Sequence, residues 1–275
     1  MYQINLETDH QNIYKPSDEL CIQIHPNWFA FAIYDREKGA FISFNSELIS
    51  HPSSEINDEM LKNWLFNHQK VLNFHFNTIN IGIHTNKFII LPKEVTDVQE
   101  SFSLLNDFNK EKEILLCSVI DSDFYIHFSI KKTIWYILIN FFEKKEFYFG
   151  DFGFIKEAQF LPKDHEFLMA QIFGNDLSIC HSKCGKPQFF NKFKFETKED
   201  LLYFIVLAYK ELNLDRNSIP LLLYGFIETE SPLFQTLFGF IRNVRIAPST
   251  AKQKQSILLK DLAPNYFQNL LNLIK

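Results

Sequence analysis

A polar motif that occurs twice contains most of the residues that could do chemistry. The motif is Gln-Ile-x-x-Asn, present as Gln23 with Asn27 and again as Gln171 with Asn175, and the two copies lie 148 residues apart. In both copies the Gln lies within a short apolar segment and the Asn lies just after it. A repeat at one fixed offset predicts a duplicated domain with an equivalent site in each half.

The residues that follow each Gln differ between the copies, and those that could contact a ligand are His25 and Asn27 in the first and Gly174, Asn175 and Asp176 in the second. A glycine turn lets backbone N–H groups close on an anion such as phosphate. Pro26 has no N–H to offer, so the first copy is the poorer anion site. Both Gln side chains are neutral and cannot replace a carboxylate facing Mg²⁺.

Two other groups of residues have a structural and a chemical interpretation. Gly225 ends an apolar segment, and Glu228 follows it; the pair could mark a ligand or cation site, or a strand-end turn and a solvated approach to a helix. Cys180, His181 and Cys184 could hold zinc, but alternation along a strand places the first two on opposite faces. A buried thiol and a hairpin cysteine are the alternative.

The elements that position these residues recur in the same order in both halves. Three strands, a helix and a strand are expected at 20–25, 28–34, 40–44, 56–68 and 78–83, and again at 167–173, 177–182, 187–195, 201–214 and 221–224. The range 112–149 adds strand, strand, helix and strand to the first half. A helix from Pro232, a strand at 243–247 and a helix at 264–274 end the second.

This pattern predicts an α/β protein of two lobes, each with a mixed five-stranded sheet flanked by helices. The loop Gly150-Asp151-Phe152-Gly153 is the expected hinge, which gives lobes of 1–152 and 153–275.

Composition limits the partners and the compartment. The formal charge is −5, which disfavours nucleic acid and anionic membranes. The four Cys show no disulfide spacing and no secretory signal precedes them, so we expect a cytoplasmic protein. The apolar run 134–142 is too short to span a membrane. Its flanking lysines allow a surface-lying helix, although a buried helix with solvated ends fits better.

The order of strands and helices, present twice, resembles the actin-like ATPase (ribonuclease H-like) fold. Segments 20–44 and 167–195 look like the two phosphate hairpins of its pilus-assembly branch. The whole chain more closely resembles a bacterial family catalogued as domain of unknown function 3822. The segments that carry this likeness are 186–207, reading KPQFFNKFKFETKEDLLYFIVL, and 223–244, with Gly225, Ser231 and Arg242-Asn243-Val244.

The resemblance implies where an ATPase site would lie and what is missing from it. The superfamily's two Asp positions align with Gln23 and Gln171, a Gly position with His25, and the second Gly of the adenosine motif with Phe226. We therefore expect a non-catalytic scaffold with a degenerate nucleotide cleft, no cofactor, and an unknown protein partner. The alternative is a protein that still binds ATP and Mg, or another phosphorylated ligand, through Gly174, Asn175 and Asp176. The oligomeric state stays open.

Overall fold

The computed structural model describes residues 3–7, 14–49, 53, 55–95, 97–105, 107–120, 124–248, 256–260, 262–263 and 265–274. The chain forms two compact units. The first comprises Met1–Phe152, Gln255–Leu259 and Asn269–Lys275, and the second comprises Gly153–Lys254 and Lys260–Gln268. We expected the continuous range 153–275 to form the second lobe; two C-terminal stretches instead join the first unit, because their side chains and carbonyls bond to its strands.

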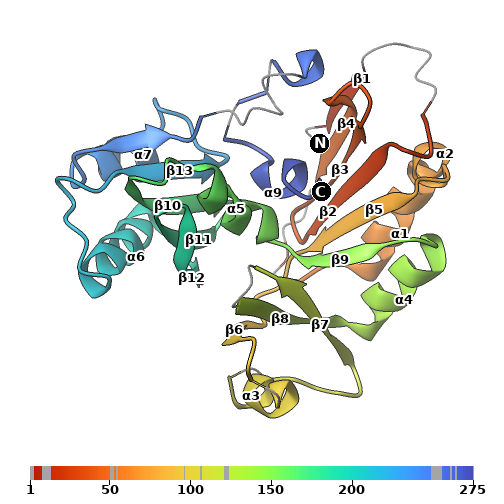
Figure 1. Ribbon diagram of the computed structural model, residues 1–275, viewed down its shortest axis with the longest axis horizontal. Coiled ribbons are helices and arrows are strands. Elements are labelled where there is room, and N and C mark those ends of the chain that lie inside the picture. The colour runs from red at the N-terminus through yellow and green to blue at the C-terminus, as the bar shows by residue number, and fades with distance from the viewer. Residues whose placement is uncertain are drawn as a thin grey trace. The chain divides into compact units, whose positions relative to one another are not determined.

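The first unit is built on a six-stranded sheet in the order β1-β4-β3-β2-β5-β9 (Figure 1). Its strands are β1 (Gln3–Glu7), β2 (Glu19–His25), β3 (Trp28–Asp35), β4 (Ala40–Leu48), β5 (Thr78–Ile83) and β9 (Glu146–Phe149). Strands β2, β3 and β4 form an antiparallel meander, and β5 runs parallel to both β2 and β9. Every residue of β2 is buried, as expected of a central strand covered on both faces.

Helices α1 (Asp58–Asn67), α2 (Gln69–Leu72) and α4 (Lys132–Phe141) belong to this unit, and α1 and α4 contact each other. Asn57 caps α1 by accepting the backbone N–H groups of Glu59 and Met60. The apolar helix α4 buries Ile134 and Leu138, as the sequence predicted. Lys145 donates to the carbonyl of Ile139 near the end of α4. This lysine therefore has a capping role in the fold.

A small sheet in the order β6-β8-β7 completes the first unit. It comprises β6 (Phe88–Pro92), β7 (Glu113–Val119) and β8 (Phe124–Lys131), with α3 (Val98–Leu105) beside it (Figure 1). Ile89, Leu91 and Phe102 form its core. The sequence analysis identified β7 and β8 and missed β1, β6 and α3, which are short elements with few buried residues.

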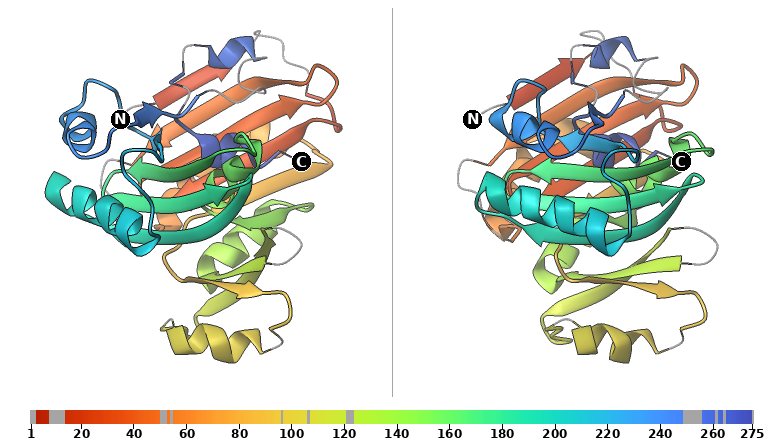
Figure 2. Two further views of the ribbon diagram at one scale, coloured as in Figure 1. Left: turned by 60° about the vertical axis from the view of Figure 1, so that its left-hand side comes forward. Right: turned by 90° about the vertical axis from the view of Figure 1, so that its left-hand side faces the viewer.

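The second unit has a five-stranded sheet in the order β12-β11-β10-β13-β14. Its strands are β10 (Glu166–Phe173), β11 (Asp176–Lys183), β12 (Lys186–Lys194), β13 (Leu221–Gly225) and β14 (Val244–Ile246). Helix α6 (Lys198–Glu211) lies across this sheet (Figure 2) and packs Leu201 and Ile205 into the core. Thr197 and Asp200 form the expected capping box at its start.

Shorter helical segments make up the rest of the second unit and the C-terminal part of the chain. They are α5 (Phe152–Glu157), η1 (Ala158–Phe160), α7 (Pro232–Phe238), η2 (Ile257–Leu259) and α9 (Gln268–Leu271). The helix expected at 264–274 is thus only one turn long. The residues on either side of α9 have side chains and carbonyls engaged with other segments instead of a helical ladder.

The two units repeat one topology. Strand β2 pairs antiparallel with β3 and parallel with β5, just as β10 pairs antiparallel with β11 and parallel with β13. Gln23 and Gln171 occupy the fifth and sixth positions of β2 and β10. They lie two residues before the last residue of their strands in both units. The first unit departs from the expected five-stranded sheet by adding β1 at its edge and by forming the separate sheet β6-β8-β7.

Candidate functional site

Gln23 is buried in β2 and its side chain already has a partner inside the first unit. Its Nε2 donates to the carbonyl oxygen of Gly150 at 2.9 Å, and the residue is 1 % exposed. Gly82 lies opposite it on β5, where a Cβ atom would come within 2.6 Å of the Gln23 Oε1. The amide therefore fits a space that only a glycine neighbour leaves open, and it ties β2 to the segment after β9.

His25 ends β2 in an aromatic and imidazole cluster. Its Nδ1 accepts the backbone N–H of Asn27 at 3.1 Å. A neutral imidazole has one N–H, so in the neutral ring that accepts this bond the proton lies on Nε2. The ring stacks on Trp28 at 5.7 Å and lies 4.1 Å from the ring of His84, which follows β5. Sequence reasoning missed His84, because only the parallel pairing of β2 and β5 places it there.

Asn27 has a structural role in the turn between β2 and β3. Its Oδ1 accepts the N–H of Ser53 at 3.1 Å, and its backbone carbonyl accepts the N–H of Ile49 at 2.8 Å. The side chain therefore holds the segment that follows β4.

The second hairpin keeps the conformation that an anion-binding turn needs. Gly174 has φ of +59°, and Gly174 and Asn175 are exposed between β10 and β11. The carbonyl of Asn175 accepts the N–H of Phe195, which anchors the turn to the end of β12. Asp176 begins β11 and is partly buried. Gln171 is buried two residues before the end of β10, beside Tyr224 of β13.

Tyr224 is neutral under ordinary conditions. Burial raises the pKa of its hydroxyl well above the ordinary value, and the Glu157 carboxylate adds to this shift. Gln171 and Tyr224 themselves are therefore both neutral.

Gly225 is fixed by the backbone and by a residue from the C-terminal part of the chain. Its φ is +87°, and a Cβ atom would lie 2.0 Å from the Ile172 carbonyl oxygen, so no other residue fits. Its N–H donates to the carbonyl of Asn265 at 2.8 Å, and the Asn265 Nδ2 donates back to the Gly225 carbonyl at 2.7 Å and to the Ile227 carbonyl at 2.9 Å. These bonds satisfy the polar groups of the strand end.

The ring of Phe226 fills the space after Gly225. It packs edge to face against Phe173, Tyr266 and Phe267, with ring centroids 5.0, 5.0 and 5.5 Å away. Glu228 is exposed, and its carboxylate accepts the Tyr266 hydroxyl at 3.3 Å. The C-terminal residues 265–267 therefore occupy the region next to Gly225 within the second unit.

Residues 269–273, near the C-terminus, bond to and pack against residues of the first unit. Asn80 of β5 donates its Nδ2 to the Leu273 carbonyl at 3.0 Å, and Leu273 lies against the Gly82 position. Asn269 donates to the Asp151 carboxylate at 3.3 Å. All of these residues are buried. Neither Asn265 nor Asn80 was singled out from the sequence, because an isolated Asn has no local pattern that reveals a distant partner.

Cys180, His181 and Cys184 do not converge as metal ligands. Cys180 is fully buried, and burial raises the pKa of its thiol to about 12. The Nε2 of His181 is 2.7 Å from Glu166 Oε1, and Cys184 is exposed in the hairpin turn with φ of +54°. The zinc interpretation is therefore wrong, and the buried thiol and hairpin cysteine are what the structure contains.

Comparison with known proteins identifies the fold. The family model described as "Protein of unknown function (DUF3822)" matches residues 6–244. A search of the curated proteins returned no match. A Bacteroides thetaiotaomicron protein with an actin-like ATPase fold and unknown function is 22% identical, with 84% of this chain and 91% of that chain covered and a TM-score of 0.73.

Two further solved structures agree on the fold. The PilM-PilN type IV pilus biogenesis complex contains a chain 10% identical to this one, with coverage of 94% and 98% and a TM-score of 0.65. The ethanolamine utilization protein EutJ from Carboxydothermus hydrogenoformans is 9% identical, with coverage of 95% and 90% and a TM-score of 0.53. The predicted actin-like fold is thus confirmed. Within the described residues, no helix has the length and apolar character needed to cross a membrane.

Proposed function

Because this chain belongs to the DUF3822 family of proteins of unknown function and has the actin-like ATPase fold, we propose that it is a non-catalytic interaction protein whose nucleotide site has degenerated. The observation that carries the proposal is the hydrogen bond between Gln23 and the Gly150 carbonyl. The position that resembles an ATPase's metal-facing Asp is neutral, buried and already paired.

The hydrogen bonds of Gly225 and the packing of the next residue support the same proposal. A glycine that resembles part of an adenosine motif has its N–H and carbonyl bonded to Asn265, and the next position is filled by the Phe226 ring. A nucleotide would have to displace these groups, and leaving buried backbone groups unpaired costs about 1–3 kcal/mol each.

Binding of a protein partner is supported by a neighbour and by the surface. The PilM-like fold is one that was solved in a complex with PilN. Phe238 and Phe240 are each 56 % exposed at the end of α7 in the second unit. Aromatic side chains are enriched at interaction surfaces.

The test is nucleotide binding and turnover by the full chain. A ligand that binds only the folded state at a hundred times its Kd stabilises it by about 2.7 kcal/mol, which a thermal shift detects. We expect no shift with ATP, ADP or GTP plus Mg²⁺ and no Mg²⁺-dependent phosphate release. A steady ATPase rate that is abolished by Gln171→Ala and retained by Gln188→Ala, a control at an exposed position of the same unit, refutes the proposal.

The second candidate function is binding of a phosphorylated ligand without hydrolysis. The specific observation that favours it is the exposed Gly174 turn with its positive φ, next to Asn175 and Asp176. Backbone N–H groups in such a turn can bind an anion.

Its test is the same thermal shift with a matched pair of variants. Gly174→Asn tolerates a positive φ but adds a side chain to the turn, whereas Gly185→Asn makes the same change in the next hairpin, where φ is +71°. A nucleotide-induced shift that Gly174→Asn removes and Gly185→Asn retains selects this candidate. A shift that both variants retain places binding elsewhere and excludes it.

A further inference from the structure

A pocket of about 260 Å³ opens in the first unit between two loops. One loop joins α2 to β5 and the other joins α4 to β9. Because β5 and β9 are parallel and both loops precede their strands, the pocket lies at the amino ends of these strands. Gly82 and the segment that starts at Gly150 lie at the carboxyl ends. The pocket is therefore separate from the groups discussed above.

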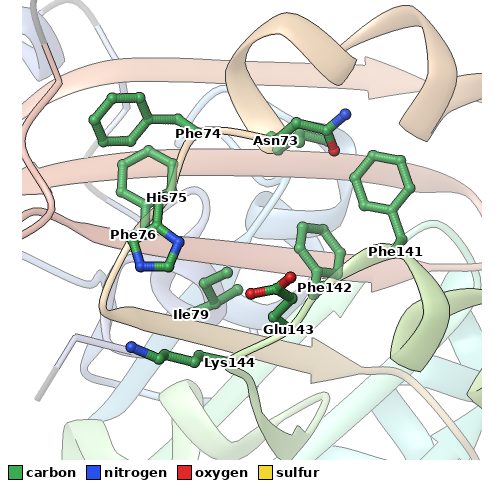
Figure 3. A pocket seen from close by; sticks show the side chains of 10 residues that line it. Asn73, Phe74, His75, Phe76, Ile79, Phe141, Phe142, Glu143 and Lys144 are labelled. Carbon is green, nitrogen blue, oxygen red and sulfur yellow. The ribbon is translucent and has the colours of Figure 1, made fainter.

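Aromatic and aliphatic side chains form its floor and walls (Figure 3), namely Leu72, Phe74, Phe76, Ile79, Phe141 and Phe142. Leu72, Phe76, Ile79 and Phe142 are buried and form the floor, while Phe74 and Phe141 are partly exposed at the edge. The rings of Phe74 and Phe76 meet edge to face at 4.9 Å, and those of Phe141 and Phe142 at 4.8 Å. These contacts fix the ring orientations, and Tyr14 also packs against Phe74 with ring centroids 5.8 Å apart.

Hydrogen bonds to backbone carbonyls hold both loops in place. The N–H of Asn73 donates to the Gln69 carbonyl, and the N–H of Phe76 donates to the Phe74 carbonyl at 2.9 Å. On the other side, Lys145 donates to the carbonyls of Phe142 and Glu143. A pocket with fixed walls binds a ligand at a low ordering cost.

Four polar side chains surround the opening, and they are exposed: Asn73, His75, Glu143 and Lys144. Within the described part of the chain, none of these four side chains has a hydrogen bond or ion pair. Figure 3 shows the Glu143 carboxylate beside Ile79, with the Lys144 amino group and the His75 ring together on the side away from Phe141. An anionic group and a cationic group thus border one aromatic pocket.

We propose that this pocket binds a free aromatic amino acid. The ring of the ligand packs against Phe74 and Phe141, its ammonium group bonds to Glu143, and its carboxylate bonds to Lys144 and His75. The charge pattern requires a ligand with both signs of charge, and the aromatic walls require a ring. The volume is below the ~300–1,000 Å³ of typical ligand pockets, so it suits a single amino acid and not a nucleotide.

Calorimetric titration with L-phenylalanine at up to ~10 mM tests the proposal, since a ligand with few atoms has a limited total binding free energy. We expect saturable binding. Glycine lacks the ring, phenylacetate lacks the ammonium group and phenethylamine lacks the carboxylate, and each should bind at least about fivefold more weakly, a loss of ~1 kcal/mol. Equal binding of phenethylamine and L-phenylalanine overturns the role of Lys144, and absence of saturable L-phenylalanine binding overturns the proposal.

Charge-neutral variants with matched controls locate the site. Glu143→Gln and Lys144→Gln should each weaken L-phenylalanine binding at least about fivefold, and Glu143→Gln should leave phenylacetate binding unchanged. The controls are Glu111→Gln and Lys110→Gln, an exposed pair in the same unit but outside the pocket. All four positions are exposed, so the variants are expected to fold. Binding that is insensitive to both pocket variants refutes the assignment.

Discussion

Replacing Gln23 by Glu tests whether its amide must donate to the Gly150 carbonyl. Glu has the same shape, but a carboxylate oxygen placed 2.9 Å from a carbonyl oxygen repels it, whereas a protonated carboxyl group can donate. Burial and this repulsion both favour the neutral form, so the folded-state pKa of Glu at position 23 rises above the unfolded value of about 4.3.

The direction of the pH effect follows from this raised pKa. Below about pH 4.3 the carboxyl group is protonated in both states, and the variant has no pH-linked cost. As pH rises, the unfolded state loses its proton first, so the free energy of unfolding falls by about 1.36 kcal/mol per pH unit until the folded pKa is reached. With a shift of about 2.5 units, well within the range for buried carboxyl groups, the cost at pH 8 is about 3.4 kcal/mol. At pH 5 it is about 1 kcal/mol.

Urea unfolding at pH 5 and pH 8, followed by tryptophan fluorescence, measures this difference. The three Trp residues, 28, 64 and 135, all belong to the first unit, so the signal reports that unit. Gln69→Glu, at an exposed position of the same unit, is the matched control and should show no added pH dependence. A Gln23→Glu variant whose cost changes by less than about 1 kcal/mol between the two pH values contradicts the structural reasoning, because one pKa unit corresponds to 1.36 kcal/mol.

Three further predictions concern the second unit, with circular dichroism as the stability measurement. Gly225→Ala should cost more than ~4 kcal/mol or prevent folding, since its Cβ would lie 2.0 Å from the Ile172 carbonyl oxygen; a cost below ~1 kcal/mol contradicts this. Asn265→Ala should cost about 2–4 kcal/mol, because two carbonyls lose their donor, whereas Asn243→Ala, at a partly exposed position with one long hydrogen bond, should cost less than ~0.5 kcal/mol; equal costs contradict the role of Asn265. The free energy of unfolding should fall above about pH 8.5, because the Cys180 thiol then ionises only in the unfolded state, burial having raised its folded pKa to about 12. If Cys180→Ala shows the same slope of unfolding free energy against pH, ionisation of Cys180 is not the cause.

The repeated topology could be predicted from sequence because its signals are local. Alternating apolar residues, the turn at Gly174 and the capping box at Thr197 each specify a structure through neighbours within a few residues. The strand β5 was predicted with the bounds that it has, Thr78–Ile83. Short elements such as β1 and α3 carry too few buried residues to show such a pattern.

The partners of the candidate residues could not be predicted, because they come from far along the chain. The sequence showed that Gln23 is neutral, but Gly150 lies 127 residues away and Asn265 lies 40 residues from Gly225. Contacts of this kind are set by the tertiary fold. The same holds for the pocket between the α2–β5 and α4–β9 loops, because its lining comes from two separate segments of the chain.

These long-range bonds show how the chain satisfies the buried polar groups at its strand ends. Each strand end that faces a nucleotide in an active relative needs its polar groups satisfied, since buried unpaired N–H and carbonyl groups destabilise a protein. In this chain the amides of Gln23, Asn80 and Asn265 bond to backbone carbonyls, and residues near the C-terminus supply or receive two of these bonds. An Asp in place of Gln23 would be a buried charge close to the Gly150 carbonyl, so a neutral amide suits this position. It follows that restoring a carboxylate alone should destabilise the first unit without creating an ATPase.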